Sequence, residues 1–248
     1  MKAMITGASS GIGRDMARIL SEKGYDLILV ARRKNRLEEL KESLHTSVTI
    51  IPMDISSTYN CMKLYEKVKN ENIEVLINNA GFGLYGEFIS TSLEKELDMV
   101  DLNVKTTHTL TKLFLNDFKK KKHGYILNVA SIAGFMSGPM MATYYATKSY
   151  VVRLTRAIQY ELKKEKSPCY VGVLCPGPVD TEFNKVANVS FNMEGLTSYE
   201  VAKYAIKKMF ERKNVIVPGF KIRFFKRILR FMPESITMNF IYKSQKRR

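Results

Sequence analysis

The 248-residue chain has few of the residues that build disulfide frameworks, metal sites or membrane spans. Its three cysteines, Cys61, Cys169 and Cys175, form no CxxC pair, and its three histidines show no metal-ligand spacing. We therefore expect no metal and no disulfide framework, and thiols in a reducing cytosol. No uncharged apolar run reaches the roughly 18 residues that a membrane-spanning helix needs. A glycine-rich motif also begins too early to leave room for a signal peptide.

Acidic residues are scarce as well, since 24 Asp and Glu stand against 40 Lys and Arg, a formal charge of +16. This excess indicates an anionic partner, and nucleic acid, an anionic membrane and a phosphorylated ligand all fit it. Glycine and proline number only 14 and 7, and hydrophobic residues make up 45%, so the chain is expected to fold rather than stay disordered.

Short apolar runs alternate with longer amphipathic segments along the chain. The expected strands are residues 3–6, 25–31, 48–53, 73–77, 124–129, 170–175 and 215–217, and the expected helices are residues 11–23, 36–44, 61–68, 93–119, 144–164 and 198–212. This order predicts an α/β fold with a doubly wound, Rossmann-type sheet of seven parallel strands and helices on both faces. Residues 1–220 are predicted to form a single dinucleotide-binding and catalytic domain.

A glycine-rich motif lies between the first strand and the first helix, where residues 6–13 read TGASSGIG. Glycines there permit a tight turn and a close approach to a phosphate, while the helix N-terminus supplies N–H groups and a positive dipole end. After the second strand, where an NAD site usually carries an Asp or Glu, residues 31–34 read ARRK. Arg32 is predicted to bind a 2′-phosphate, so NADP(H) is favoured over NAD(H).

Tyr144 and Lys148 are four residues apart, so on a helix they lie on one face. An ammonium group close to a phenol is expected to lower the pKa of Tyr144 toward the range of a general acid/base. During reduction Tyr144 would protonate a carbonyl oxygen as hydride arrives from the nicotinamide, and Ser131 would hydrogen-bond the same oxygen. Tyr145 is expected to point elsewhere and to serve in packing.

Together with Asp54 and Ile55, the NNAG motif at residues 78–81, and Pro176-Gly177, these motifs resemble the short-chain dehydrogenase/reductase family over residues 1 to about 218. The resemblance implies an oxidoreductase acting on CH–OH or C=O groups. Its implied catalytic residues are Asn103, Ser131, Tyr144 and Lys148. It implies further that Lys148 holds the nicotinamide ribose and that Asn103 supports a water relaying protons to Lys148. The cofactor-binding residues it implies are Gly7, Ser9, Gly11, Ile12 and Gly13 at the pyrophosphate, Arg32 at the 2′-phosphate, Asp54 and Ile55 at the adenine, Asn79 and Gly81 near the ribose, and Tyr144, Lys148, Pro176, Gly177, Val179 and Thr181 around the nicotinamide.

Residues 181–196 are expected to cover the substrate, a small carbonyl or alcohol compound. Their apolar members either form a lid over an apolar substrate or pack the segment onto the body; they are Phe183, Val186, Val189, Phe191, Met193 and Leu196. The sequence leaves open the substrate and the direction of the reaction. The alternative to an enzyme is a non-catalytic NADP(H)-sensing or membrane-surface scaffold with the same fold.

The end of the chain is strongly basic, since residues 221–248 hold nine Lys and Arg and one Glu, half of the net charge. Their pattern predicts a basic amphipathic C-terminal helical extension that Pro233 ends or kinks. Docking on the body or on a second subunit and peripheral contact with an anionic membrane both fit it; nucleic-acid binding rests on charge alone. The tail argues against the family's common tetramer, so a homodimer through the helices around Asn103 and Tyr144 is favoured. The expected location is cytoplasmic, with peripheral membrane contact through the tail as one option.

Overall fold

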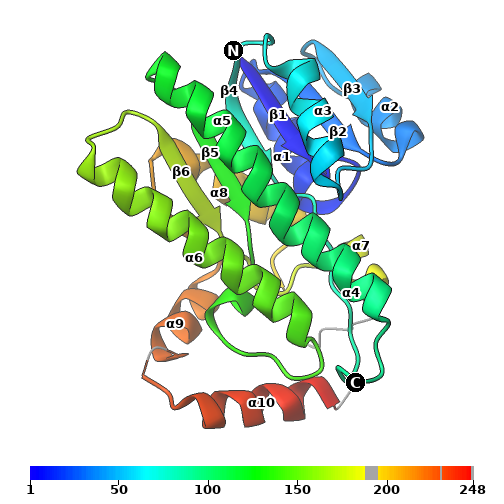
Figure 1. The fold of residues 1–248 in the computed structure, drawn as a ribbon, viewed down its shortest axis with the longest axis vertical. Helices are drawn as coiled ribbons and strands as arrows, with labels where there is room; N and C mark the ends of the chain where they lie inside the picture. The colour runs from blue at the N-terminus through cyan, green and yellow to red at the C-terminus, as the bar shows by residue number, and fades with distance from the viewer. Residues whose placement is uncertain (188–194, 230, 247–248) are drawn as a thin grey trace.

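The computed structural model describes residues 1–187, 195–229 and 231–246. Its centre is one sheet of seven parallel strands in the order β3-β2-β1-β4-β5-β6-β7, with helices around it (Figure 1). The strands are β1 (Lys2–Thr6), β2 (Asp26–Ala31), β3 (Val48–Pro52), β4 (Ile73–Asn78), β5 (Tyr125–Val129), β6 (Tyr170–Leu174) and β7 (Val215–Ile216). The predicted fold class, a doubly wound Rossmann-type sheet, is confirmed.

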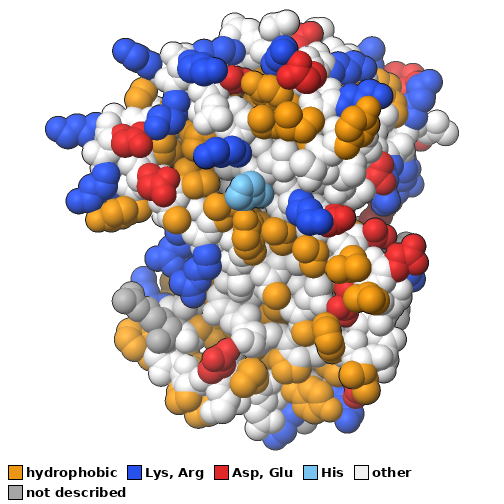
Figure 2. Space-filling model, in the orientation of Figure 1, with side chains coloured by type: hydrophobic (Ala, Val, Ile, Leu, Met, Phe, Trp, Pro, Cys, Tyr) orange, Lys and Arg blue, Asp and Glu red, His pale blue; other side chains and the backbone are white. Residues whose placement is uncertain are grey.

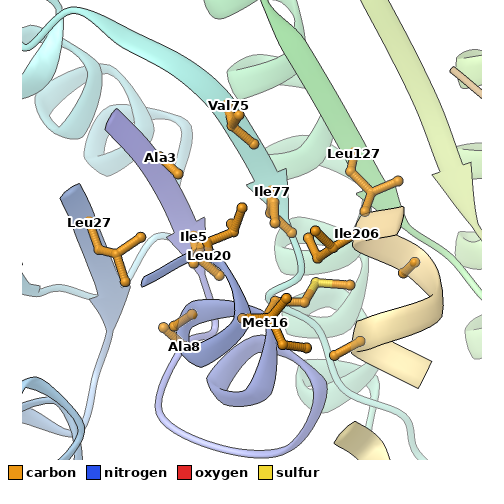
Figure 3. Packing of buried hydrophobic residues seen from close by; sticks show 14 of the residues in the cluster. Ala3, Ile5, Ala8, Met16, Leu20, Leu27, Val75, Ile77, Leu127 and Ile206 are labelled. Carbon is orange, nitrogen blue, oxygen red and sulfur yellow. The ribbon is translucent and has the colours of Figure 1, made fainter. Parts of the chain in front are cut away.

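Two layers of helices cover the sheet because successive strand residues point to opposite faces. One layer consists of α1 (Gly11–Glu22), α2 (Lys34–Glu42) and α8 (Ser198–Phe210), and the other of α3 (Thr58–Val68), α5 (Thr107–Lys121) and α6 (Ala142–Lys164). In β1, Ala3 and Ile5 belong to the core of the first layer, whereas Met4 belongs to the second. Figure 3 shows the first core, in which Met16 of α1 and Ile206 of α8 pack below the sheet.

The strand order reverses between β1 and β4. From β1 the chain runs outward through β2 to β3, and then crosses back to start the other half at β4. In such sheets, ligands bind outside the carboxyl ends of the strands at the point of reversal. The residues that follow β1, β2, β4, β5 and β6 are therefore brought to one edge of the sheet.

The helix expected over residues 93–119 differs from a regular helix in its middle. It consists of α4 (Leu93–Val100), a π-helical turn (Asp101–Thr106) and α5. A π-turn accommodates an extra residue within an α-helix and is frequent at functional sites. The predicted catalytic residue Asn103 lies in it, and hydrophobic periodicity does not detect such a one-residue insertion.

The basic tail docks on the body through two helices, α9 (Phe220–Leu229) and α10 (Glu234–Lys246), with Pro233 between them. Figure 1 places both at the lower end of the molecule, beneath α6. Every fourth residue of α10 is buried, at Thr237, Ile241 and Gln245, so the helix packs by one face. Ile222 of α9 packs partly buried against a core at the end of β6.

Three further observations concern membrane spans, metal sites and cysteines. No helix in the described part of the chain is both long and apolar enough to cross a membrane. Over the same residues, no group of three or more His, Cys, Asp or Glu side chains is placed to hold a metal ion. All three cysteines are buried free thiols.

Candidate active site

A cavity of about 430 Å³ opens at the carboxyl edge of the sheet, where the strand order reverses. It is an elongated site that joins the glycine-rich motif to the N-terminal end of α6. Sixteen of the predicted site residues line it: Gly7, Ser9, Gly11, Ile12, Arg32, Asp54, Ile55, Asn79, Gly81, Ser131, Tyr144, Lys148, Pro176, Gly177, Val179 and Thr181. Gly13 and Asn103 are not lining residues and lie behind the wall.

The glycine-rich motif forms a tight turn with its backbone against β4. Gly7 and Gly11 have φ of +66° and +52°, values that residues with a side chain rarely adopt. A Cβ atom on Gly7 would lie 2.8 Å from the Cα of Ala80. Ser10 caps α1 without a side-chain hydrogen bond, so the first N–H groups of that helix are not used by the cap. This turn and helix start fit the pyrophosphate of a dinucleotide.

Asn79 holds the turn in place. Its Nδ2 donates to the backbone oxygens of Thr6 and Gly7, at 3.1 Å each, and its backbone N–H donates to the Thr6 hydroxyl at 3.0 Å. The same hydroxyl accepts from the N–H of Ala80. The amide of Asn79 thus joins the end of β1 to the end of β4 while its residue also lines the cavity.

Two adjacent arginines, Arg32 and Arg33, lie at the far end of the cavity, and among the described residues only Arg33 has hydrogen bonds within the site. Arg33 donates from Nη2 to the Ser9 hydroxyl (3.1 Å) and to the Glu182 carboxylate (2.6 Å), and Arg36 lies 3.6 Å from the same carboxylate. The hydrogen bond from Arg33 holds the pKa of Glu182 below its usual range. The sequence predicted Arg32, and not Arg33, as the residue that binds the cofactor. The signal for this prediction was the adjacent pair of arginines, which includes Arg33.

The phenol of Tyr144 is buried, and burial raises its pKa well above the ordinary value. A hydrogen bond with the Ser131 side chain lowers it only partly. Burial therefore opposes the lowering of this pKa that was expected from Lys148. Lys148 Nζ lies 5.8 Å from the centre of the Tyr144 ring.

Lys148 is buried below the tyrosine, where Nζ donates to the backbone oxygen of Val129 at 3.1 Å. Burial lowers the pKa of Lys148 to about 8. The Ser131 hydroxyl accepts from the backbone N–H of Ala133 at 3.1 Å, at the start of a 3₁₀ turn over Ile132–Phe135. These bonds orient both side chains from the end of β5 and the turn that follows it.

Asn103 connects the π-turn to the catalytic helix and to the loop after β4. Its Nδ2 donates to the Phe82 backbone oxygen (2.9 Å) and to the Thr147 hydroxyl (3.1 Å), and its Oδ1 accepts from the Phe82 N–H (3.1 Å). A Cβ on Gly81 would lie 2.7 Å from that Oδ1 and 3.4 Å from Lys148 Nζ. The glycine therefore leaves space between Asn103 and Lys148, beside the position at which the water relay was predicted.

The opposite end of the cavity is lined by apolar and aromatic residues. The rings of Tyr144 and Tyr145 meet edge to face with their centres 6.1 Å apart, and Phe183 of α7 (Glu182–Val186) lies 5.4 Å from Tyr144. Tyr145 lines the cavity instead of pointing elsewhere, but it also packs against the apolar cluster there, in agreement with the expected packing role. Gln245, from the last turn of α10, also lines it, and no sequence motif had marked that residue.

Part of the predicted lid lies outside the described residues, namely Val189, Phe191 and Met193 together with the side chain of Val186. Phe183 faces the cavity, as a lid residue would. Leu196 is half-buried against the core of the first helix layer, as a packing residue would be. The described part of the segment therefore contains one residue of each kind.

Residues 1–190 match the family described as short chain dehydrogenase. The chain is also similar, at 34% identity over 233 residues, to the NADP-dependent 3-hydroxy acid dehydrogenase of Schizosaccharomyces pombe; the match covers 86% of this chain and 88% of that one. A short-chain dehydrogenase from Sphingobium yanoikuyae in complex with NADPH matches with a TM-score of 0.82 and 28% identity over 88% of each chain. A structure from Burkholderia phymatum in complex with NAD has a TM-score of 0.83 over 91% of each chain, but at 24% identity it is evidence for the fold alone.

Proposed function

The chain belongs to the short-chain dehydrogenase/reductase family and is therefore an oxidoreductase, and from this premise we propose that it uses NADP(H) to interconvert a carbonyl group and a secondary alcohol. One observation carries the proposal: Ser131, Tyr144 and Lys148 lie on the wall of the same cavity whose other end has the glycine turn and two arginines. The relatives give no support to a non-catalytic scaffold.

The cavity fits a dinucleotide along its length. Gly7, Ser9, Gly11 and Ile12 would hold the pyrophosphate, Asp54 and Ile55 the adenine, and Pro176, Gly177, Val179 and Thr181 the nicotinamide end. When bound, the nicotinamide supplies the hydride for reduction or accepts it for oxidation. Gly13 would contribute by close packing rather than contact, since a Cβ there would lie 2.5 Å from the Gly7 backbone oxygen.

Tyr144 would be the general acid in the reductive direction. Its raised pKa keeps the phenol protonated at neutral pH, which is the form that can donate a proton to a carbonyl oxygen. Ser131, hydrogen-bonded to Tyr144, would donate to the same oxygen, and a charged Lys148 would stabilise negative charge that develops on the phenol.

The preference for NADP(H) rests on Arg32 and Arg33. Both line the adenosine end of the cavity, and Arg33 is already oriented there by Ser9. A guanidinium binds a phosphate through charge-assisted, paired hydrogen bonds, whereas the carboxylate usual in NAD sites would repel it. The fission yeast relative, whose name records NADP dependence, supports the same preference.

A panel of carbonyl compounds tests the proposal: ketones, aldehydes, steroids, sugars and acyl thioesters with NADPH or NADH, and 3-hydroxy acids with NADP⁺. We expect turnover of at least one class and tighter binding of NADPH than of NADH in fluorescence titrations. A protein that binds NADPH but turns over no compound would contradict the enzymatic role. Equal affinity for NADPH and NADH would contradict the cofactor preference.

A second role, peripheral contact with an anionic membrane, is favoured by the outward face of the tail. Phe220, Phe224 and Ile228 follow each other every four residues on α9 and are exposed, and Ile236 and Phe240 do the same on α10. On the face shown in Figure 2, hydrophobic side chains gather at the lower end, where Figure 1 places these helices. Exposed cations, Lys221, Arg227 and Lys243 among them, flank this face. Apolar side chains bordered by cations suit an anionic lipid surface, whereas the same cationic face of a second copy would be repelled.

Vesicle sedimentation tests this role without removing the tail. We expect binding to phosphatidylglycerol vesicles that weakens in high salt, is absent with phosphatidylcholine alone, and is lost in the double variant Phe224→Ser, Phe240→Ser. Phe88→Ser is the matched control, because Phe88 is exposed but lies outside the tail. Unchanged binding in the double variant would contradict the role. A homodimer through the outer faces of α4, α5 and α6 stays a prediction, which the mass in solution tests.

A further inference from the structure

The last turn of α10 brings a polar side chain to the apolar end of the active-site cavity. Gln245 is only 5% exposed and lines the cavity, although it lies 100 residues beyond its neighbour Tyr145. The Tyr85 hydroxyl donates to the backbone oxygen of Gln245 at 2.9 Å. The helix end is therefore held by the main chain of residue 245, and this contact does not depend on which side chain is present.

The side chain of Gln245 is poorly satisfied by the protein. Its Nε2 has two long contacts, 3.4 Å to the Tyr145 hydroxyl and 3.7 Å to the sulfur of Met141. Its Oε1 is buried and has no hydrogen-bond partner among the residues that the structure describes. An unpaired buried carbonyl oxygen destabilises the folded chain, and an apolar side chain of equal length would avoid that cost. A carboxamide at this position is explained if a bound molecule supplies the missing donor.

The surroundings define what kind of donor fits. Met141 and Tyr144 belong to one apolar cluster at this end, and Phe82, Tyr145 and Phe183 pack on it. Among the described lining residues, the only cations are Arg32 and Arg33 at the adenosine end and Lys148 beneath the catalytic tyrosine. Within the described part of the chain, no cation is thus placed to pair with a free carboxylate beside Gln245. The lining carboxylates are Asp54 and Glu182, and Glu182 pairs with Arg33, so none pairs there with an ammonium group and the group that meets Oε1 is neutral.

We propose that Gln245 is a specificity-determining residue whose Oε1 accepts a hydrogen bond from a neutral hydroxyl or amide N–H of the substrate, remote from the reacting carbonyl. The substrate class is then a ketone, or the corresponding alcohol, with an apolar body and one such donor. This inference rests on the proposed function, and it separates this chain from an enzyme for free hydroxy acids.

A matched pair of ketones tests the inference: para-(hydroxymethyl)acetophenone and para-ethylacetophenone, which differ in a hydroxyl against a methyl group, with the meta isomers covering a second donor position. For the wild type we expect kcat/KM to favour a hydroxylated member by about 10-fold or more, because its analogue leaves Oε1 unpaired. Gln245→Met keeps the length of the side chain without the acceptor, and the preference should fall to about 1. Ser244→Ala, on the exposed neighbour, should leave the preference unchanged.

Two measurements keep the test independent of turnover. Calorimetric binding of the corresponding alcohols to the NADPH complex should show the same preference and the same loss in Gln245→Met. The melting temperature of Gln245→Met should rise, by about 2–4 °C, because an unpaired buried acceptor is removed. A lower melting temperature with an unchanged preference would make Gln245 a structural residue and overturn the inference, as would a wild type without preference in either assay. NADPH binding without reduction of any ketone would contradict the proposed function. The alcohol-binding assay would still test the role of Gln245 in that case.

Discussion

The two ends of the cavity are assembled in different ways. At the cofactor end, Gly7 and Asn79 follow directly after β1 and β4, and Arg33 lies two residues after β2, so a short motif and its strand determine where each residue lies. At the substrate end, Tyr145, Phe183 and Gln245 come from three segments spread over 100 residues. The parallel sheet therefore determines the cofactor end, whereas the segments that pack over the sheet determine the substrate end.

Loss of the general acid, Tyr144, should lower the reaction rate more than any other change, because the cofactor end and the substrate end both act together with it. Tyr144→Phe is expected to lower the rate of carbonyl reduction by about 10²- to 10⁴-fold, the contribution typical of a positioned acid. Its affinity for NADPH, measured by fluorescence, should change little. Tyr145→Phe, the adjacent tyrosine on the same helix, is the control and should retain most of the rate. Similar losses in both variants would remove the distinction between the acid and its neighbour.

The cofactor end is tested by the two arginines. Arg33→Ala should weaken NADPH binding by about 10- to 100-fold, since a charge-assisted pair to the phosphate is lost. NADH binding should stay nearly constant because NADH lacks the 2′-phosphate. We expect a smaller loss from Arg32→Ala, whose residue has no observed bond to the glycine turn, and none from Lys34→Ala, which pairs with Glu38 on α2. Weaker NADPH binding in Arg32→Ala alone would mean that Arg32, and not Arg33, binds the 2′-phosphate.

The burial of Lys148 predicts how reduction depends on pH. Its pKa of about 8 is lowered from the usual value, so the ammonium is present below pH 8 and is lost as the pH rises above it. Because a neutral lysine does not stabilise developing negative charge on Tyr144, kcat/KM for NADPH, which reports groups of the free enzyme, should fall by up to about tenfold per pH unit above 8. Lys148→Met should be slow and lack this decrease. A flat wild-type profile from pH 7 to 10 would contradict the role of the ammonium.

Glu182 joins the two ends, and its replacement should have the smallest effect. It lies in α7 on the substrate side but pairs with Arg33 at the cofactor end. This exposed pair competes with the 2′-phosphate, so Glu182→Gln should strengthen NADPH binding by about 2- to 5-fold, the range of a surface ion pair. Glu38→Gln, which breaks an exposed pair on α2, is the control. Weaker NADPH binding in Glu182→Gln would mean that the carboxylate orients Arg33 for the phosphate.

The differences between expectation and structure occur where side-chain surroundings matter. Arg32 and Arg33 are adjacent, and the sequence does not say which of two neighbours turns toward Ser9. Tyr144 has the lysine that the YxxxK spacing predicts, yet its pKa rises because the phenol is buried. Spacing along a helix predicts which side chains are neighbours, but the free energy of burying a charge depends on all the groups that surround it.

The sequence by itself determined the parallel sheet, the order of its motifs and the position of Ser131, Tyr144 and Lys148 at its carboxyl edge. These follow from local rules, because apolar strands, glycine turns and helix periodicity act over few residues. Only the tertiary structure decided that Arg33 bonds to the glycine turn, that Tyr145 lines the cavity and that Gln245 reaches it. Those contacts depend on how side chains from separate segments pack together, and packing between distant segments leaves no periodic signal in the chain.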